Sequence, residues 1–168
     1  MLEKLCPRVQ AGSVLELNLD ELKQLGIKSI IFDLDNTLVE WKQDTLSPEV
    51  IELITRFKTY GFKLCILSNA LEHRVEAIAG VLSIPYVSCA AKPRKSSFKK
   101  ALEILGTIPE ETAVVGDQLF TDILGGNRME LYTIWTPPLS STEFLSTKAV
   151  RQIERLVVKR FRRKGILQ

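Results

Sequence analysis

The segment SIIFDLDNTLVE, residues 29–40, begins as an apolar run and stops abruptly at two aspartates, Asp33 and Asp35. A short apolar run of this kind is typical of a buried strand rather than a solvent-facing one. Both acids would then follow the carboxyl end of the strand, which is where ligands bind in open α/β sheets. Because Asp-Asn-Thr is also ordinary turn chemistry, this segment alone leaves a catalytic and a turn-forming role open.

Strand and helix signals alternate along the rest of the chain. Ser47 and Pro48 mark the start of a helix that stops at Gly61. Because parallel strands need crossover connections, the alternation predicts an α/β, Rossmann-like three-layer fold with a mainly parallel central sheet. The other expected elements are short strand 13–17, helix 19–25, strands 62–67, 84–91, 112–115 and 131–136, helix 72–82, a helix capped by Ser96 or Ser97 that ends at Gly106, and a short helix from about Thr121.

Polar residues follow four of the predicted strands. They are Asp33 and Asp35, Ser68 and Asn69, Lys92, and Asp117 and Asp122. In a parallel sheet the carboxyl ends of the strands lie on one edge, so we expect these side chains to converge. A set of carboxylates with a hydroxyl, an amide and an ammonium group suits metal-assisted chemistry on a phosphate, and oxygen ligands favour Mg²⁺.

These motifs resemble those of haloacid dehalogenase-superfamily phosphatases. The matching positions are DxDxT at Asp33, Asp35 and Thr37, the strand-terminal Ser68, Lys92-Pro93, and GDxxxxD at Asp117 and Asp122. The resemblance covers about residues 28–136, in the family's order. It implies that Asp33 is a nucleophile that forms an aspartyl-phosphate, and that Mg²⁺ is held by the Asp33 carboxylate, the Asp35 backbone carbonyl and Asp117.

The same resemblance assigns supporting roles. Asp35 would protonate the leaving alkoxide and then take a proton from the attacking water, which needs a raised pKa. Lys92 would supply a second cation and Ser68 a hydrogen bond to the phosphoryl group, which makes both residues catalytic and substrate-binding. Asn69 either binds near the phosphate or forms a turn. Asp122 either orients Lys92 or a metal-bound water, or is an acid favoured at a helix start.

The spacing of the motifs predicts that no cap domain covers the site. Residues 36–67 leave room for one helix, and residues 70–91 for one helix and one strand. An open site excludes water poorly around a small metabolite, so a bulky substrate or a neighbouring subunit would have to cover it.

Trp41 either contacts such a substrate or belongs to the core, and His73 is expected to be solvated. The basic segment 94–100, RKSSFKK, either favours a polyanionic substrate beside the site or is a solvated helix face.

Composition and charge indicate one domain over residues 1–168, with a lead-in at 1–27, a catalytic core at 28–136 and a basic helix or tail at 142–168. Residues 148–168 hold eight of the 23 basic residues and one of the 20 acidic residues, a net charge of +7, which leaves a net charge of −4 on residues 1–147.

The tail's apolar stripe predicts a helix packed on the domain, with residues 159–164 available to anions such as a membrane surface. The stripe consists of Val150, Ile153, Leu156, Val157 and Phe161.

Targeting and redox signals are few. No apolar run approaches the roughly 20 residues that span a bilayer, and the N-terminal residues lack a secretory pattern. We therefore expect a cytoplasmic protein, with peripheral contact at an anionic membrane left open. Three widely separated cysteines predict neither a disulfide framework nor a CxxC metal site.

The short build, the lead-in and the stretch GDQLFTDILGGNRM, residues 116–129, resemble subfamily IIIA, in particular the branch that contains phosphatidylglycerophosphate phosphatases. This resemblance implies a phospholipid head-group monoester as the substrate. Two alternatives stay open: a phosphatase for another bulky substrate, such as a phosphoprotein or a nucleic-acid end, and a non-enzymatic module that binds RNA or a partner through its basic tail. The sequence predicts no oligomeric state.

Overall fold

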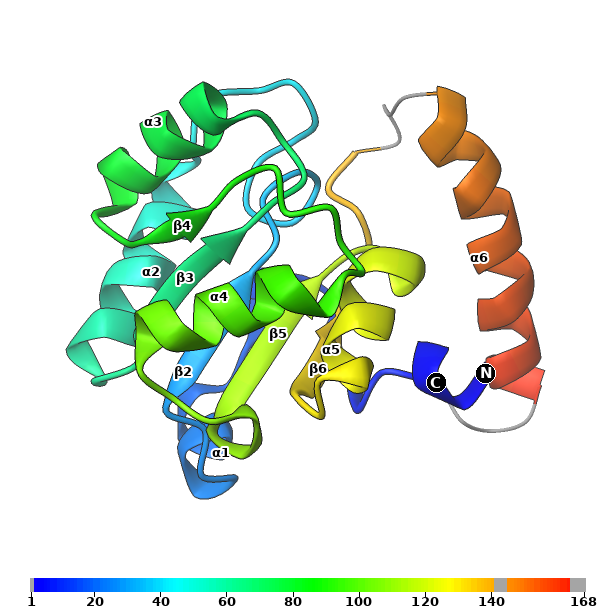
Figure 1. Cartoon of the computed structure of the whole chain (residues 1–168), viewed down its shortest axis with the longest axis horizontal. Helices are drawn as coiled ribbons and strands as arrows, with labels where there is room; N and C mark the ends of the chain where they lie inside the picture. Colours follow the sequence, from blue (N-terminus) through cyan, green and yellow to red (C-terminus); the bar gives the residue numbers. More distant parts are fainter. Residues whose placement is uncertain (1, 141–144, 164–168) are drawn as a thin grey trace.

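A single parallel sheet forms the centre of the fold in the computed structural model, which describes residues 2–140 and 145–163 (Figure 1). The strand order is β1-β6-β5-β2-β3-β4, and every neighbouring pair is parallel. The strands are β1 (Val9–Gln10), β2 (Ser29–Phe32), β3 (Lys63–Leu67), β4 (Tyr86–Val87), β5 (Thr112–Gly116) and β6 (Tyr132–Trp135). The predicted α/β class is confirmed.

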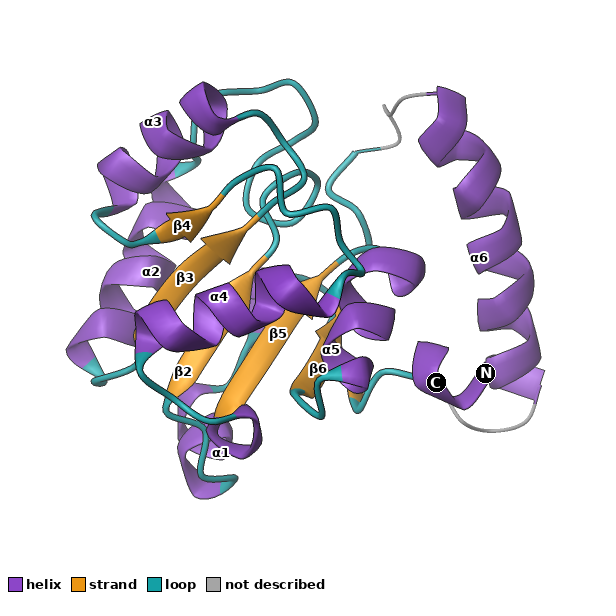
Figure 2. Cartoon of the chain, in the orientation of Figure 1, coloured by secondary structure: helices purple, strands orange, loops and turns teal. Residues whose placement is uncertain are grey.

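The described α-helices are shown in purple in Figure 2, and local chemistry explains the start of α2 and the end of α4. They are α1 (Leu19–Gln24), α2 (Pro48–Thr59), α3 (Glu72–Leu82), α4 (Lys95–Leu105), α5 (Leu124–Arg128) and α6 (Leu145–Arg163). At the start of α2, the Ser47 side chain accepts a hydrogen bond from the backbone N–H of Val50, and Pro48 occupies the first helical position. Helix α4 ends at Gly106, whose φ of +60° is the left-handed conformation that glycine adopts without steric cost.

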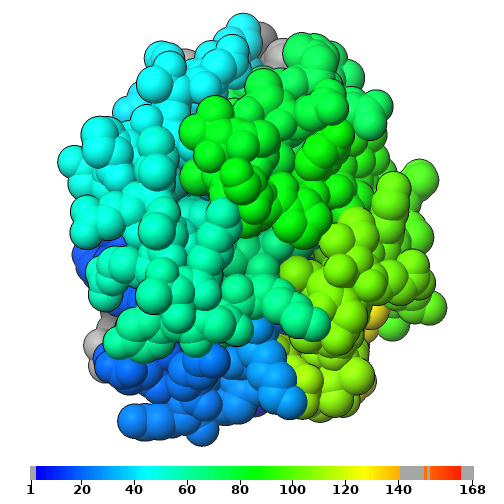
Figure 3. Space-filling model, turned by 90° about the vertical axis from the view of Figure 1, so that its left-hand side faces the viewer, coloured from blue at the N-terminus to red at the C-terminus, as the bar shows by residue number. Residues whose placement is uncertain are grey.

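A hydrophobic layer lies on each face of the sheet. Along β2, Ile30 and Phe32 pack with residues of α1, α2 and α3, whereas Ile31 packs with residues of α4. Successive strand residues point to opposite faces, so a fully apolar β2 contributes to both layers. Figure 3 shows the side formed by α2 and α3, in cyan to green, with blue lead-in residues below them. The predicted helix cover on both faces is confirmed.

Three boundary predictions were wrong. Residues 13–17 contain a turn of 3₁₀ helix, Val14–Glu16, instead of a strand, and the lead-in strand is β1. The strand expected at 84–91 is only Tyr86–Val87, and the residues from 88 to 94 form the loop that carries Lys92. Helix α4 starts at Lys95 after Arg94, with no side-chain cap.

Helix α6 packs on the domain along a narrower stripe than the sequence predicts. Val157 and Phe161 are buried against Leu5, Leu119 and Ile123. The other large apolar side chains of the predicted stripe, Ile153 and Leu156, are 54% and 69% exposed, while the acid Glu154 is buried. The prediction that all five apolar residues form one stripe packed on the domain is therefore wrong. Lys164 and residues 142–144, also assigned to this tail, lie outside the described residues.

The segments between the site motifs are short. Residues 36–67 contain α2 and β3, and residues 70–91 contain α3 and β4, so neither segment forms a cap domain. The prediction of a capless fold is confirmed. None of the described helices is sufficiently long and apolar to cross a membrane.

Candidate functional site

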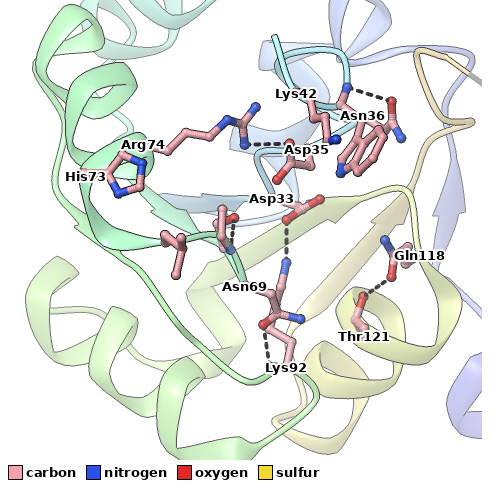
Figure 4. Close-up of a pocket in the computed structure, with 14 residues that line it drawn as sticks. Asp33, Asp35, Asn36, Lys42, Asn69, His73, Arg74, Lys92, Gln118 and Thr121 are labelled. Carbon is pink, nitrogen blue, oxygen red and sulfur yellow. Dashed lines mark hydrogen bonds and ion pairs between the residues drawn. The ribbon is translucent and has the colours of Figure 1, made fainter. Parts of the chain in front are cut away.

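Asp33 occupies the centre of the polar cluster at the carboxyl edge of the sheet (Figure 4). It follows β2, which is hydrogen-bonded to β3 on one side and β5 on the other, and its backbone N–H donates to the Val115 carbonyl at 2.9 Å. One carboxylate oxygen of Asp33 accepts a hydrogen bond from Lys92 Nζ at 2.5 Å, and the other accepts one from Thr37 Oγ1 at 3.4 Å. Asp33 is therefore held from both sides at a buried strand end.

Lys92 lies between two buried carboxylates. Its Nζ is 2.5 Å from Asp33 Oδ1 and 2.6 Å from Asp122 Oδ1. Burial lowers the pKa of Lys92, but the charges of Asp122 and Asp33 outweigh it and raise this pKa above the ordinary value. Lys92 is therefore a fixed positive charge beside Asp33.

Asp122 makes two contacts through its two carboxylate oxygens. One carboxylate oxygen accepts from Lys92, and the other accepts the backbone N–H of Gln118 at 3.1 Å, at the start of the helical turn Leu119–Ile123. The glycine before Asp117 makes this approach possible, since a Cβ at Gly116 would lie 2.4 Å from the Asp122 carboxyl carbon.

Three buried carboxylates, those of Asp33, Asp117 and Asp122, offer oxygen atoms that all lie within 4.8 Å of one another. Thr37 Oγ1 donates over 3.4 Å to both Asp33 and Asp117, and the Asp117 carbonyl accepts from Trp135 Nε1 at 2.8 Å. With Asp35, four carboxylates face the two cations Lys92 and Arg74. A divalent cation fits this site, because its oxygen donors are of the preferred type and its excess negative charge would be balanced.

Asp35 points away from the three-carboxylate cluster, toward α3. Its Oδ1 accepts a hydrogen bond from Arg74 Nη1 at 2.6 Å. Burial raises the pKa of Asp35, the Arg74 charge lowers it, and the neighbouring Asp33 carboxylate raises it, with a net upward shift. The pKa of this carboxyl group is thus shifted in the direction that favours its protonated form.

Ser68 and Asn69 enter the site at the end of β3. Both line the cavity, and Ser68 is 1% exposed, with its Oγ accepting from the backbone N–H of Ala70 at 3.1 Å. The side-chain oxygen of Asn69 accepts from the backbone N–H of Lys92 at 2.8 Å. Asn69 therefore joins two of the strand-end loops while it lines the cavity.

A cavity of about 470 Å³ opens above Asp33. Asp35, Ser68 and Lys92 also line it, together with the half-buried Trp41 and the exposed His73. Trp41 is therefore available to a bound substrate. The four basic residues of the segment 94–100 do not line this cavity and are exposed around the start of α4, which fits the solvated-face alternative.

Arg74 is the functional residue that the sequence reasoning missed. A cation in the first turn of a helix opposes the helix dipole, and this unfavourable placement was the available signal that a carboxylate lies nearby. The contact itself depends on how the loop after Asp35 folds against α3, which no short sequence pattern reports.

A family model for haloacid dehalogenase-like hydrolases matches residues 39–129. The chain belongs to this family. It is also 38% identical over 156 residues to the Bacillus subtilis protein named "Probable phosphatase YqeG", covering 93% of this chain and 91% of that protein.

Two further comparisons show similarity to one more curated relative and, in fold alone, to a solved structure. It is 29% identical over 171 residues to phosphatidylglycerophosphate phosphatase 1 of Arabidopsis thaliana, covering 95% of this chain but only 49% of that protein. The structure of deoxy-D-mannose-octulosonate 8-phosphate phosphatase from Haemophilus influenzae, in its cobalt-bound form, matches with a TM-score of 0.57 and 14% identity, over 82% of this chain and 90% of that one. The predicted family and enzyme class are confirmed.

Proposed function

We propose that this hydrolase cleaves phosphate monoesters through an aspartyl-phosphate on Asp33. The observation that carries the proposal is the placement of the Asp33 carboxylate: it lies at the floor of the open cavity, next to a fixed ammonium group and two further buried carboxylates. A carboxylate held in one orientation beside positive charge can attack phosphorus without first reorganising its surroundings.

The reaction divides into two displacements. In the first, an Asp33 oxygen bonds to phosphorus while the bond from phosphorus to the ester oxygen breaks, and the departing oxygen takes a proton from Asp35. In the second, water attacks the same phosphorus, Asp35 takes its proton, and the bond to Asp33 breaks to release inorganic phosphate. Lys92 offsets the charge of the phosphoryl oxygens, and Ser68 donates a hydrogen bond to them.

We further propose that the divalent cation is Mg²⁺, held by the carboxylates of Asp33 and Asp117 and by the backbone carbonyl of Asp35. When bound, Mg²⁺ would supply positive charge that offsets the repulsion between an anionic nucleophile and an anionic phosphate. Asp122 stays with Lys92, because the 2.6 Å ion pair already engages one of its oxygens.

We assign the substrate to the phospholipid head-group monoesters, of which phosphatidylglycerophosphate is the test case. The Arabidopsis relative that carries this activity in its name supports the assignment, as does an uncovered cavity that would leave the rest of a large substrate outside. Another bulky phosphate, such as a phosphoprotein or a nucleic-acid end, is the second candidate on the same cavity observation.

Peripheral contact with an anionic membrane belongs to the same proposal. On α6, the basic residues Lys159, Arg160, Arg162 and Arg163 are exposed. The exposed Ile153 and Leu156 lie on the same helix, and such a combination attracts a helix to anionic lipid. Sedimentation with anionic vesicles tests the contact, and equal sedimentation after removal of residues 159–168 would exclude the tail as the membrane contact.

The decisive experiment measures phosphate release from phosphatidylglycerophosphate in micelles, phosphopeptides, sugar phosphates and phosphorylated oligonucleotides. We expect the lipid to give the highest kcat/KM, with activity lost on chelation and restored by Mg²⁺. Asp33→Asn should abolish turnover, and the matched control Asp20→Asn, on the exposed side of α1, should not. Turnover by Asp33→Asn would refute the nucleophile, and preference for small sugar phosphates would refute the bulky substrate.

A further inference from the structure

The guanidinium group of Arg74 makes three polar contacts at once. Nη1 donates to Asp35 Oδ1 at 2.6 Å, Nε to Asp44 Oδ1 at 2.8 Å, and Nη2 to the backbone carbonyl of Gln43 at 2.7 Å. The Arg74 side chain is only 16% exposed, although Asp44 is 72% exposed. Three different nitrogen atoms are used, so the contacts fix both the position and the plane of the guanidinium group.

These contacts connect three parts of the chain that meet at the cavity. Arg74 lies in the first turn of α3, Asp35 follows the nucleophile strand, and Gln43 and Asp44 belong to the loop of residues 40–46. The same loop contributes Trp41 and Lys42 to the cavity wall. One side chain therefore sets the orientation of Asp35 and the position of the substrate-facing loop.

The chemistry of the contact requires arginine. A planar fork can donate to two carboxylates and a carbonyl in fixed directions, whereas the single ammonium of lysine acts as a point charge without that directionality. Because a cation in the first turn of a helix is unfavourable, α3 alone gives no reason for arginine at this position. The two carboxylates offset that cost and keep the guanidinium in the site.

We propose that Arg74 is a positioning residue that orients the Asp35 carboxyl group toward the oxygen of the leaving group. Through its contacts with Gln43 and Asp44, Arg74 also links this orientation to the position of the loop of residues 40–46. A substrate whose leaving group contacts Trp41 or Lys42 therefore stabilises the position of the loop in which Arg74 holds the Asp35 carboxyl group in line with the leaving oxygen. This inference rests on the proposed function, because it uses Asp35 as the proton donor to a phosphate ester.

Substrates with different leaving groups test the inference. An alkoxide needs a proton as it departs, whereas 4-nitrophenolate leaves readily without one. Arg74→Lys should therefore lower kcat/KM on an alkyl phosphate by about 100-fold, within the usual contribution of general acid catalysis. In kcat/KM for 4-nitrophenyl phosphate the same variant should lose no more than about threefold, since the nucleophile and its cation are unchanged. The comparison uses kcat/KM because it reports the first displacement and not the later attack of water, for which Asp35 is the base.

Two further variants separate the arms of the contact. Asp44→Ala removes the carboxylate contact of the loop and leaves the Asp35 contact in place, and we expect a raised KM for the bulky substrate with kcat nearly unchanged. In an Asp35→Asn background, Arg74→Lys should cause no further loss on the alkyl phosphate, because the group through which it acts is gone. Arg56→Lys, an exposed arginine on α2, is the matched control and should behave as wild type on both substrates.

The outcomes distinguish this inference from the proposed function. Equal losses on both substrates, or an undiminished effect of Arg74→Lys in the Asp35→Asn background, would overturn the positioning role. If Asp33→Asn retains phosphate release, the proposed function fails whatever Arg74 does. If Asp33→Asn is inactive and Arg74→Lys matches wild type, only the inference about Arg74 fails. Thermal unfolding of each variant shows whether a loss of activity reflects a loss of fold.

Discussion

Replacing Lys92 with methionine should destabilise the metal-free protein strongly. Methionine keeps a long unbranched side chain but removes the charge that lies 2.5 Å from Asp33 and 2.6 Å from Asp122. The side chains of these three residues are 3%, 8% and 1% exposed, so solvent cannot replace the lost cation. Removing one partner of a buried ion pair costs about 3–5 kcal/mol, and because two carboxylates share Lys92 we expect the upper part of this range.

Urea unfolding with a chelator present measures the loss in free energy of unfolding. The matched control is Lys95→Met, an exposed lysine at the start of α4, which should change stability by less than about 0.5 kcal/mol. Adding Asp122→Asn to Lys92→Met should recover part of the loss, since one uncompensated charge disappears. A loss below about 1 kcal/mol for Lys92→Met, or a double variant no more stable than the single one, would refute the argument.

Three other predictions follow from packing and burial. Gly116→Ala would place a Cβ 2.4 Å from the Asp122 carboxyl carbon, so it should displace that carboxyl group and lower kcat. Phosphate release measures kcat, and an unchanged kcat would contradict the close contact between residue 116 and Asp122. Burial raises the pKa of Cys65 to about 12, from 9.0, so its contribution to stability is present below pH 9 and lost as the pH rises toward 12. Native iodoacetamide labelling followed by mass spectrometry should therefore modify the exposed Cys89 and spare Cys65. Phe161→Ala should cost about 3 kcal/mol in urea unfolding if α6 docks as described, whereas truncating the exposed leucine of α6 at position 156 should cost little.

The sequence was sufficient where one local signal and one geometric rule agree. The serine and proline that open α2 and the glycine that closes α4 are local, and α2 begins and α4 ends where the sequence predicts. The convergence of Asp33, Ser68 and Asp117 depends only on the rule that parallel strands end on one edge. That rule needs no knowledge of side-chain packing.

The apolar pattern of the sequence was insufficient where a polar contact, local or distant, decides the outcome. Residues 13–17 look like a strand, but the Ser13 hydroxyl accepts the backbone N–H of Leu15 and starts a 3₁₀ turn. Glu154 looks like a solvated residue, yet its carboxylate accepts the backbone N–H of Phe120 at 3.2 Å, and it is buried on α6 while Ile153 and Leu156 are exposed. Arg74 looks like a surface residue until the loop of residues 40–46 is placed against α3.

The pairing of β1 with β6 has a consequence for how the chain folds during synthesis. Val9 lies opposite Ile134 and Gln10 opposite Trp135, so β1 has no partner in the sheet until residues 134 and 135 have been synthesised. By contrast, β2 and β3 can pair once residue 67 has emerged. Among the described strands, the sheet can therefore begin to form in its middle, and β1 can join it only after β6 has been made.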